Sequence, residues 1–180
     1  MARRVFRFSP THGEVRHFSL LDGVVGGQMA GGLFALMQML AAAAGDGSAW
    51  LPWRLAASLL LGSGAVSAPA SASIVLAGLF VHLMLSAFFG ALWAVAARLL
   101  WPAMRDNLGS HAALAALYGA GVWLLNVQLI ARGMFPWINS YDSPAQVLLH
   151  AFAYGLPLGL YVATRVRAVD AAVEQGRHPA

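Results

Sequence analysis

The sequence contains no cysteine and few charged residues, and each shortage excludes a class of structure. Without cysteine the chain forms no disulfide, no thiolate metal site and no iron–sulfur cluster. Charged residues make up 10% of its 180 residues, against about 25% in soluble domains. Hydrophobic residues make up 59%, against roughly 45–50% in soluble domains. This composition predicts an integral membrane protein.

Lysine is also absent, so all 11 basic residues are arginine. In a soluble protein, their excess over the 7 acidic residues would suggest binding to nucleic acid. Here the arginines cluster at the ends of apolar segments, where the positive-inside rule of membrane proteins accounts for them. We therefore expect no nucleic-acid partner.

The sequence lacks a complete catalytic or metal-binding motif. It has no H-x-x-x-H or H-E-x-x-H spacing for zinc, and no G-x-S-x-G surrounds a serine. No carboxylate lies deep within an apolar stretch, which disfavours a proton- or sodium-coupled transporter. No enzymatic activity is predicted.

Four apolar stretches reach the roughly 20 residues that a membrane-spanning helix needs. We predict an all-α membrane protein with four transmembrane helices over about residues 20–44, 73–98, 111–133 and 145–165. The first begins with SLLD at residues 19–22, the S-x-x-D pattern of a capping box. The apolar stretch at residues 50–62 is too short to span, so we expect it to be interfacial or re-entrant.

The arginines predict the orientation of the chain. Nine of the 11 lie in the N-terminal arm, the second loop and the C-terminal tail, against Arg54 and Arg132 in the other two loops. By the positive-inside rule both termini are cytoplasmic. The arm has no apolar core before a cleavage site, so no cleaved signal peptide is predicted. We divide the chain into a cytoplasmic arm (1–19), a transmembrane domain (20–165) and a cytoplasmic tail (166–180).

The arm mixes arginine with apolar residues at positions 3–8, and it contacts either anionic lipid headgroups, which we favour, or the cytoplasmic face of a partner. The two outward loops share a Pro-Trp pattern, WLPW at residues 50–53 and MFPW at residues 134–137. Each pattern precedes a helix that carries a histidine, His82 or His150. One interpretation is a pair of tandem helical hairpins related by an axis along the membrane normal. The other is that Pro-Trp pairs mark turns at the membrane interface.

Small residues recur at four-residue spacing in three of the predicted helices. This spacing places them on one stripe of a helix, where they let two backbones approach closely in a membrane. We expect helix packing at Gly23, Gly27, Gly31, Gly78, Ser86, Gly90, Gly155 and Gly159.

His82 shares the stripe of the second helix, so we expect it in a helix interface and not facing lipid. A histidine within a span is a candidate functional residue because polar groups are costly in hydrocarbon. One interpretation is a neutral imidazole that hydrogen-bonds a neighbouring helix. The other is a haem b or quinone site that His82 forms with His150, although their expected depths differ by about 6 Å.

The outward loop at residues 131–146 has the richest mixture of aromatic, charged and polar residues. It forms either a surface for a partner subunit or a loop closed by pairing of Arg132 with Asp142. The candidate partner-binding residues are Arg132, Trp137, Tyr141 and Asp142.

Four features together carry a resemblance over about residues 20–165. They are GGQMAGG in the first span, an LPWRLAASLLLG interfacial segment, a VHLMLSAFFGALWA span and a last span that begins with histidine. In this pattern the chain resembles small uncharacterised four-span inner-membrane proteins of bacteria. The resemblance implies a multi-pass protein of the bacterial inner membrane, but no activity and no functional residues.

We predict a non-catalytic accessory or assembly subunit that packs against other integral membrane subunits of a bacterial respiratory or photosynthetic complex. The reasons are the missing active site, the many small-residue stripes and the small soluble mass. Two alternatives stay open. One is an electron-transfer protein that binds haem b or quinol through His82 and His150, and the other is a small channel or transporter.

Overall fold

The computed structural model describes residues 19–45, 47–104, 108–141 and 144–177. Within these ranges the chain is all-helical and has no strands. Four helical segments are long and apolar enough to span a membrane: Leu20–Gly45, Ala72–Leu100, Leu108–Met134 and Pro144–Ala168. The prediction of four such helices is confirmed, and every end lies within three residues of the predicted one.

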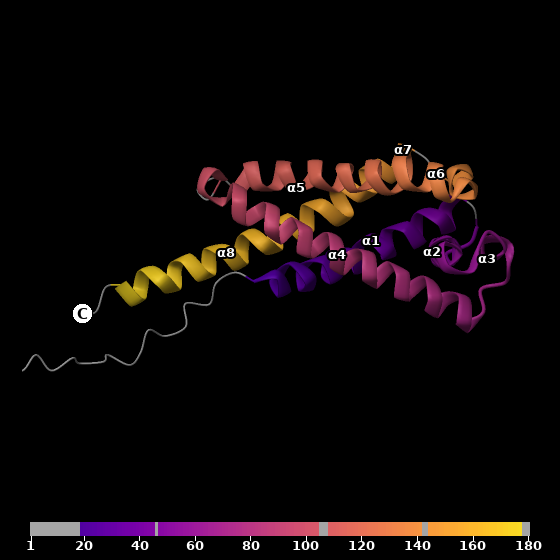
Figure 1. Cartoon of the computed structure of the whole chain (residues 1–180), viewed down its shortest axis with the longest axis horizontal. Coiled ribbons are helices and arrows are strands. Elements are labelled where there is room, and N and C mark those ends of the chain that lie inside the picture. Colours follow the sequence, from indigo (N-terminus) through magenta and orange to yellow (C-terminus); the bar gives the residue numbers. More distant parts are fainter. Residues whose placement is uncertain (1–18, 46, 105–107, 142–143, 178–180) are drawn as a thin grey trace, which may run out of the picture.

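Short elements connect or interrupt the long helices. The first half of the chain contains α1 (Leu20–Gly45), α2 (Leu51–Leu61), α3 (Gly64–Ser67) and α4 (Ala72–Met104). The second half contains α5 (Leu108–Trp123), η1 (Leu124–Ala131), α6 (Arg132–Met134), η2 (Pro136–Tyr141), α7 (Pro144–Leu148), η3 (Leu149–Gly155) and α8 (Leu156–Arg177). In Figure 1, α2, α3, α6 and α7 gather at one end of the bundle, and the turn from α4 to α5 lies toward the other.

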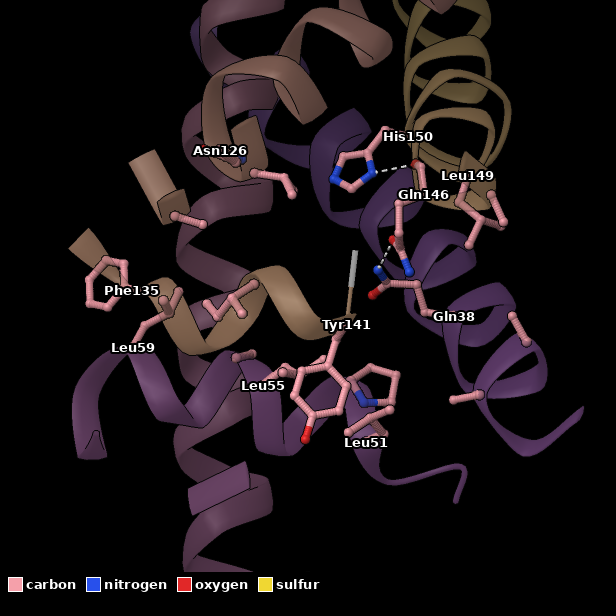
Figure 2. Close-up of a pocket in the computed structure, with 18 of the residues that line it drawn as sticks. Gln38, Leu51, Leu55, Leu59, Asn126, Phe135, Tyr141, Gln146, Leu149 and His150 are labelled. Carbon is pink, nitrogen blue, oxygen red and sulfur yellow. Dashed lines mark hydrogen bonds between the residues drawn. The ribbon is translucent and has the colours of Figure 1, made fainter. Parts of the chain in front are cut away.

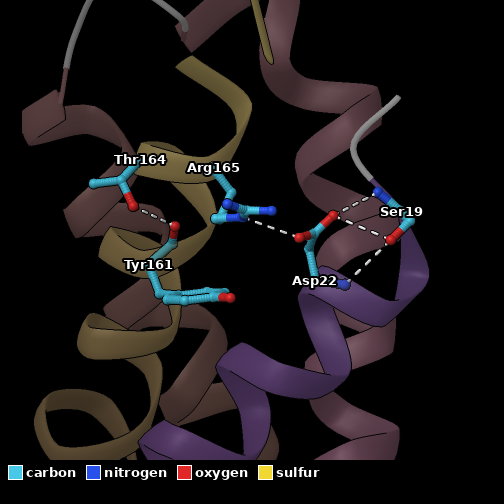
Figure 3. Close-up of polar contacts among 5 residues, drawn as sticks. All are labelled: Ser19, Asp22, Tyr161, Thr164 and Arg165. Atoms are coloured by element: carbon cyan, nitrogen blue, oxygen red, sulfur yellow. Dashed lines mark hydrogen bonds and ion pairs between the residues drawn. The ribbon is translucent and has the colours of Figure 1, made fainter. Parts of the chain in front are cut away.

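The start of α1 is fixed by the capping box that the sequence predicted. The backbone N–H of Ser19 donates to the Asp22 carboxylate at 2.9 Å, and the Asp22 N–H donates to the Ser19 hydroxyl at 3.4 Å. The first bond satisfies an amide that has no partner within the helix, and the Asp22 N–H also donates to the Ser19 carbonyl at 3.1 Å. The other Asp22 oxygen accepts a 3.0 Å bond from Nε of Arg165, which ties α8 to α1 (Figure 3).

A close glycine crossing joins α1 to α4. A Cβ added to Gly27 would overlap the Ser86 carbonyl oxygen and would lie 2.8 Å from the Gly90 Cα. A Cβ on Gly90 would likewise overlap the Gly23 carbonyl oxygen. The two backbones therefore approach closely enough to exclude any larger residue at these positions.

A second glycine crossing joins α5 to the helix formed by η3 and α8. A Cβ on Gly119 would overlap the His150 carbonyl oxygen, and a Cβ on Gly155 would overlap the Ala115 carbonyl oxygen. Gly159 also packs against the side chain of Ala115. The small-residue stripes are thus used for contacts within the chain itself.

Hydrogen bonds from three other helices end on backbone carbonyls of α4. Interhelical bonds of this kind contribute about 0.6 kcal/mol each on average in membranes. The bonds run from Gln28 to Leu83, from Tyr154 to Ser86 and from Tyr118 to Phe89, at 2.8, 3.0 and 2.7 Å. The core around them is formed by Phe34, Phe89, Trp93, Ala94, Leu158 and Val162, all of which are buried.

The short helix α2 packs against α4 and is held at both ends. A Cβ on Gly78 of α4 would overlap the Trp53 carbonyl oxygen, so α2 lies directly on the α4 backbone. The Arg54 guanidinium donates to the Ser48 hydroxyl at 3.0 Å and to the Ala68 carbonyl at 3.4 Å. The loop before α2 and the end of α3 are therefore linked through one side chain.

Candidate functional site

A cavity of about 700 Å³ lies at the end of the bundle where α2 and η2 are found (Figure 2). Residues of α1, α2, η1, η2, α7 and η3 line it, together with Leu85 of α4. The walls are mainly leucine, alanine, valine, isoleucine and phenylalanine, and none of the described residues that line the cavity carries a charge. The polar residues among them are Gln38, Asn126, Ser140, Tyr141, Gln146 and His150.

Two glutamine side chains and His150 form a polar cluster on one wall of this cavity. The Gln38 amide donates to the Gln146 amide oxygen at 2.9 Å, and Nδ1 of His150 donates to the Gln146 backbone carbonyl at 2.8 Å. Figure 2 shows the two amides facing each other below the imidazole. In the described part of the chain, the Gln38 oxygen and the Gln146 NH2 group make no other hydrogen bond. The pair thus offers the Gln38 oxygen as an acceptor and the Gln146 NH2 group as a donor to a bound molecule.

Two of the helical segments that line the cavity widen into π-helices beside it. Residues 124–131 and residues 149–155 form π-helices, η1 and η3, which supply Asn126 and His150 to the lining. π-Helical turns are rare and often occur at functional sites. Nothing in the composition of these two segments predicts the wider turn.

The structure places His82 and His150 in different environments. Nε2 of His82 donates to the Gly31 carbonyl at 2.9 Å and lies 3.4 Å from the Ser86 hydroxyl oxygen. His82 does not line the cavity, whereas His150 does. The His82 imidazole links α4 to α1, at a point where a Cβ added to Gly31 would lie 3.3 Å from Nε2 of His82.

The Phe34 ring contacts both imidazoles. It stacks parallel to His82 with centroids 6.2 Å apart, and it meets His150 edge-on at 4.5 Å. A haem iron held by two histidines requires both rings to face one cavity with their coordinating nitrogens toward the metal. Because His82 lies outside the cavity and its Nε2 is hydrogen-bonded to Gly31, these two residues do not fit as a pair of haem ligands. In the described ranges no group of three metal-ligating side chains is present either.

The predicted partner-binding loop (residues 131–146) and α2 both line the cavity, and together they form the wall that we call its cover. The Trp137 indole N–H donates to the Ser58 hydroxyl at 3.0 Å, and this bond joins η2 to α2. Trp137 also packs against the buried cluster of Ala42, Leu51 and Val66. Tyr141 lines the cavity, Arg132 is exposed, and Asp142 lies outside the described residues, as does most of the N-terminal arm.

The sequence marks some residues of this site as candidates, but it does not show which of them meet in the folded chain. His150 belongs to the haem or quinone alternative, and Gln38 and Asn126 are polar residues within apolar spans, which marks them as candidate functional residues. Gln146 belongs to the outward loop in the sequence, so its meeting with Gln38 could not be foreseen. No protein-family model, no curated protein and no solved structure matches the chain.

Proposed function

We propose that this protein binds a neutral, mainly apolar molecule in the cavity between α1, α2, η1, η2 and η3. The observation that carries the proposal is the uncharged lining with one polar cluster formed by Gln38, Gln146 and His150. Sites for small molecules are apolar cavities of about 300–1,000 Å³ with a few polar groups that orient the ligand. A carbonyl or hydroxyl on the ligand would match the free donor and acceptor of the glutamine pair.

The lack of charge in the lining determines which ligands are expected. An ionised headgroup would lose its hydration without gaining an opposite charge, and this cost is large in an apolar site. Phosphates and carboxylates are therefore disfavoured, whereas quinones, fatty alcohols and acylglycerols are compatible. A quinone would use His150 and the glutamine pair, without His82.

We place the protein in the bacterial inner membrane with both termini in the cytoplasm. The support is the distribution of arginines, with Arg54 in α2 and Arg132 in α6, two helices at the same end of the bundle (Figure 1). In this orientation the cavity lies in the outer half of the membrane. The length of α2, 11 residues, is too short to span, so we place it at the outer interface as part of the cover.

We also propose that the two hairpins are tandem repeats. Gly27 meets Gly90 in the first hairpin as Gly119 meets Gly155 in the second. This register does not superimpose the two histidines, since His82 lies eight residues before Gly90 and His150 lies five residues before Gly155. Only one hairpin would then supply a histidine to the cavity.

The role of accessory or assembly subunit stays a prediction. Its main reason was the number of small-residue stripes, and glycines in those stripes pack against helices of the same chain. The exposed apolar faces contact lipid as readily as protein. The channel or transporter alternative also stays a prediction.

The proposal is tested by purifying the protein from native membranes and analysing its organic extract by mass spectrometry. An Ala56→Phe variant fills the cavity from α2, because Ala56 lines it and is partly exposed. Leu60→Phe is the matched control, since Leu60 is 59% exposed on the same helix. We expect a neutral apolar compound at near-stoichiometric amount in wild type and Leu60→Phe, and its loss in Ala56→Phe. Equal amounts of every compound in the three extracts would contradict the proposal.

A further inference from the structure

An apolar groove runs along the outside of the bundle between α1 and η3. It is lined by Leu33, Met37, Leu148, Phe152 and Ala153, together with three residues that also line the cavity. Every residue that lines it is apolar. Leu33, Leu148 and Phe152 are 41%, 57% and 58% exposed, so the groove faces the lipid in a membrane-inserted bundle.

The groove and the cavity adjoin at a seam between α1 and α7. Ala41, Ala145 and Leu149 line both hollows. Ala41 and Ala145 are exposed and present only a methyl group at this boundary. The Gln38–Gln146 hydrogen bond lies beside the seam, because Gln38 is one turn before Ala41 and Gln146 follows Ala145.

We propose that the ligand carries a long apolar chain that leaves the cavity through this seam and lies in the groove. This inference rests on the proposed function, because it requires the polar end of the ligand to occupy the cavity. The Gln38–Gln146 pair holds that polar end, and the alanines leave room for the chain beside it. From Ala41 to Leu33 the groove follows α1 for about 12 Å at 1.5 Å per residue.

The apolar chain of the ligand also determines how the ligand reaches its site. A neutral lipid dissolved in the bilayer approaches the groove directly, since the groove faces hydrocarbon. It then slides its polar end past Ala41 and Ala145 to the two amides. The shared chemistry is a hydrogen-bonding head with no charge and one long chain, which both prenylated quinones and monoacylglycerols possess.

The test uses the full chain in lipid nanodiscs and two pairs of probes. Decylubiquinone is compared with 2,3-dimethoxy-5-methyl-1,4-benzoquinone, which has the same head without the chain, by quenching of the tryptophan fluorescence. Monooleoylglycerol is compared with glycerol by displacement of decylubiquinone. The two pairs distinguish a quinone from a glycerolipid. Each variant is measured against wild type in the same nanodiscs, so partition of the probe into lipid cancels.

Ala41→Leu narrows the seam from α1, and Ala145→Leu narrows it from α7. Ala43→Leu is the matched control, because Ala43 is exposed on the same helix and lines neither hollow. We expect each seam variant to weaken the binding of the chain-bearing probes at least about tenfold more than the binding of the chainless ones. This difference corresponds to the loss of about two buried methylenes. Ala43→Leu should bind as wild type does.

Each other outcome overturns a defined part of the account. If the seam variants weaken both members of a probe pair equally, or if the chain adds no affinity in wild type, the chain does not use the groove and the cavity proposal stands. Equal losses of probe affinity in Ala43→Leu and Ala41→Leu would also show that the ligand chain does not pass through the seam. If none of the probes binds wild type and no compound co-purifies with it, the proposed function fails together with this inference.

Discussion

Gln38 and Gln146 lie 108 positions apart in the chain, and a 2.9 Å hydrogen bond joins their side-chain amides at the seam between α1 and α7. The bond connects the end of the first long helix to the start of the last one. It also lies where the uncharged cavity meets the apolar groove. The same pair therefore holds two helices together and offers hydrogen-bonding groups to a ligand.

Replacing one glutamine should be worse for stability than replacing both. In Gln38→Leu or Gln146→Leu the remaining amide loses its partner in a part-buried site, at a cost of about 1 kcal/mol. The double variant removes both polar groups and should recover most of that loss. Reversible unfolding in mixed micelles of detergent and SDS measures it. All three variants should lose bound ligand, so the effects on stability and on binding can be told apart. A double variant that is less stable than either single variant would contradict the predicted recovery of stability.

The glycine crossing of α1 and α4 predicts a sharp contrast between neighbouring positions. Gly27→Ala should destabilise the fold by about 1–3 kcal/mol, because its methyl overlaps the Ser86 carbonyl oxygen. Gly32→Ala adds its methyl where nothing lies within 4 Å, and should be neutral or stabilising by up to about 1 kcal/mol. The same unfolding assay compares the two. Similar effects at both positions would show that the helices do not cross at Gly27.

The two histidines should have separable effects. His82→Leu removes the bond to the Gly31 carbonyl and should cost about 0.6 kcal/mol of stability without changing the ligand content. His150→Leu changes the cavity lining and should lower the ligand content. Mass spectrometry of the extracts from both variants tests this. Equal loss of ligand from both would restore a site shared by the two histidines.

The ion pair between Arg165 and Asp22 should contribute little and depend on salt. The Arg165 side chain is 47% exposed, and exposed pairs contribute about 0.2–1 kcal/mol. Arg165→Gln should therefore reduce stability by less than about 1 kcal/mol at low ionic strength. The difference should vanish near 1 M salt, where screening acts over about 3 Å. A salt-independent loss would mean that Arg165 acts through packing.

The sequence predicts the spans and the start of α1 because those features are local. A run of about 20 apolar residues is recognisable without knowledge of its neighbours, and the Ser19–Asp22 box needs only four residues. The four-residue spacing of Gly23 and Gly27 likewise marks a helix face, although it does not name the partner helix. These features depend on composition and period alone.

The cavity could not be predicted because distant segments form it. Gln38 and Gln146 meet only after two hairpins have packed together, and Trp137 reaches Ser58 across 79 positions to close the cover. Of the two interpretations that the sequence allows for His82, the structure favours the imidazole that bonds a neighbouring helix, because His82 donates to the Gly31 carbonyl and lies outside the cavity. The two histidines also lie at different offsets from the glycine crossings, eight residues before Gly90 for His82 and five residues before Gly155 for His150.

The most direct test of the central claim is a native mass spectrum of the purified protein after equilibration with equal amounts of monododecanoylglycerol and dodecanoate. The two probes have the same acyl chain, but only the second carries a charge. An uncharged cavity predicts one bound monododecanoylglycerol in wild type, little dodecanoate, and neither in Ala56→Phe. Equal binding of both probes, or the same adducts in wild type and Ala56→Phe, would contradict the claim that the cavity binds a neutral apolar molecule.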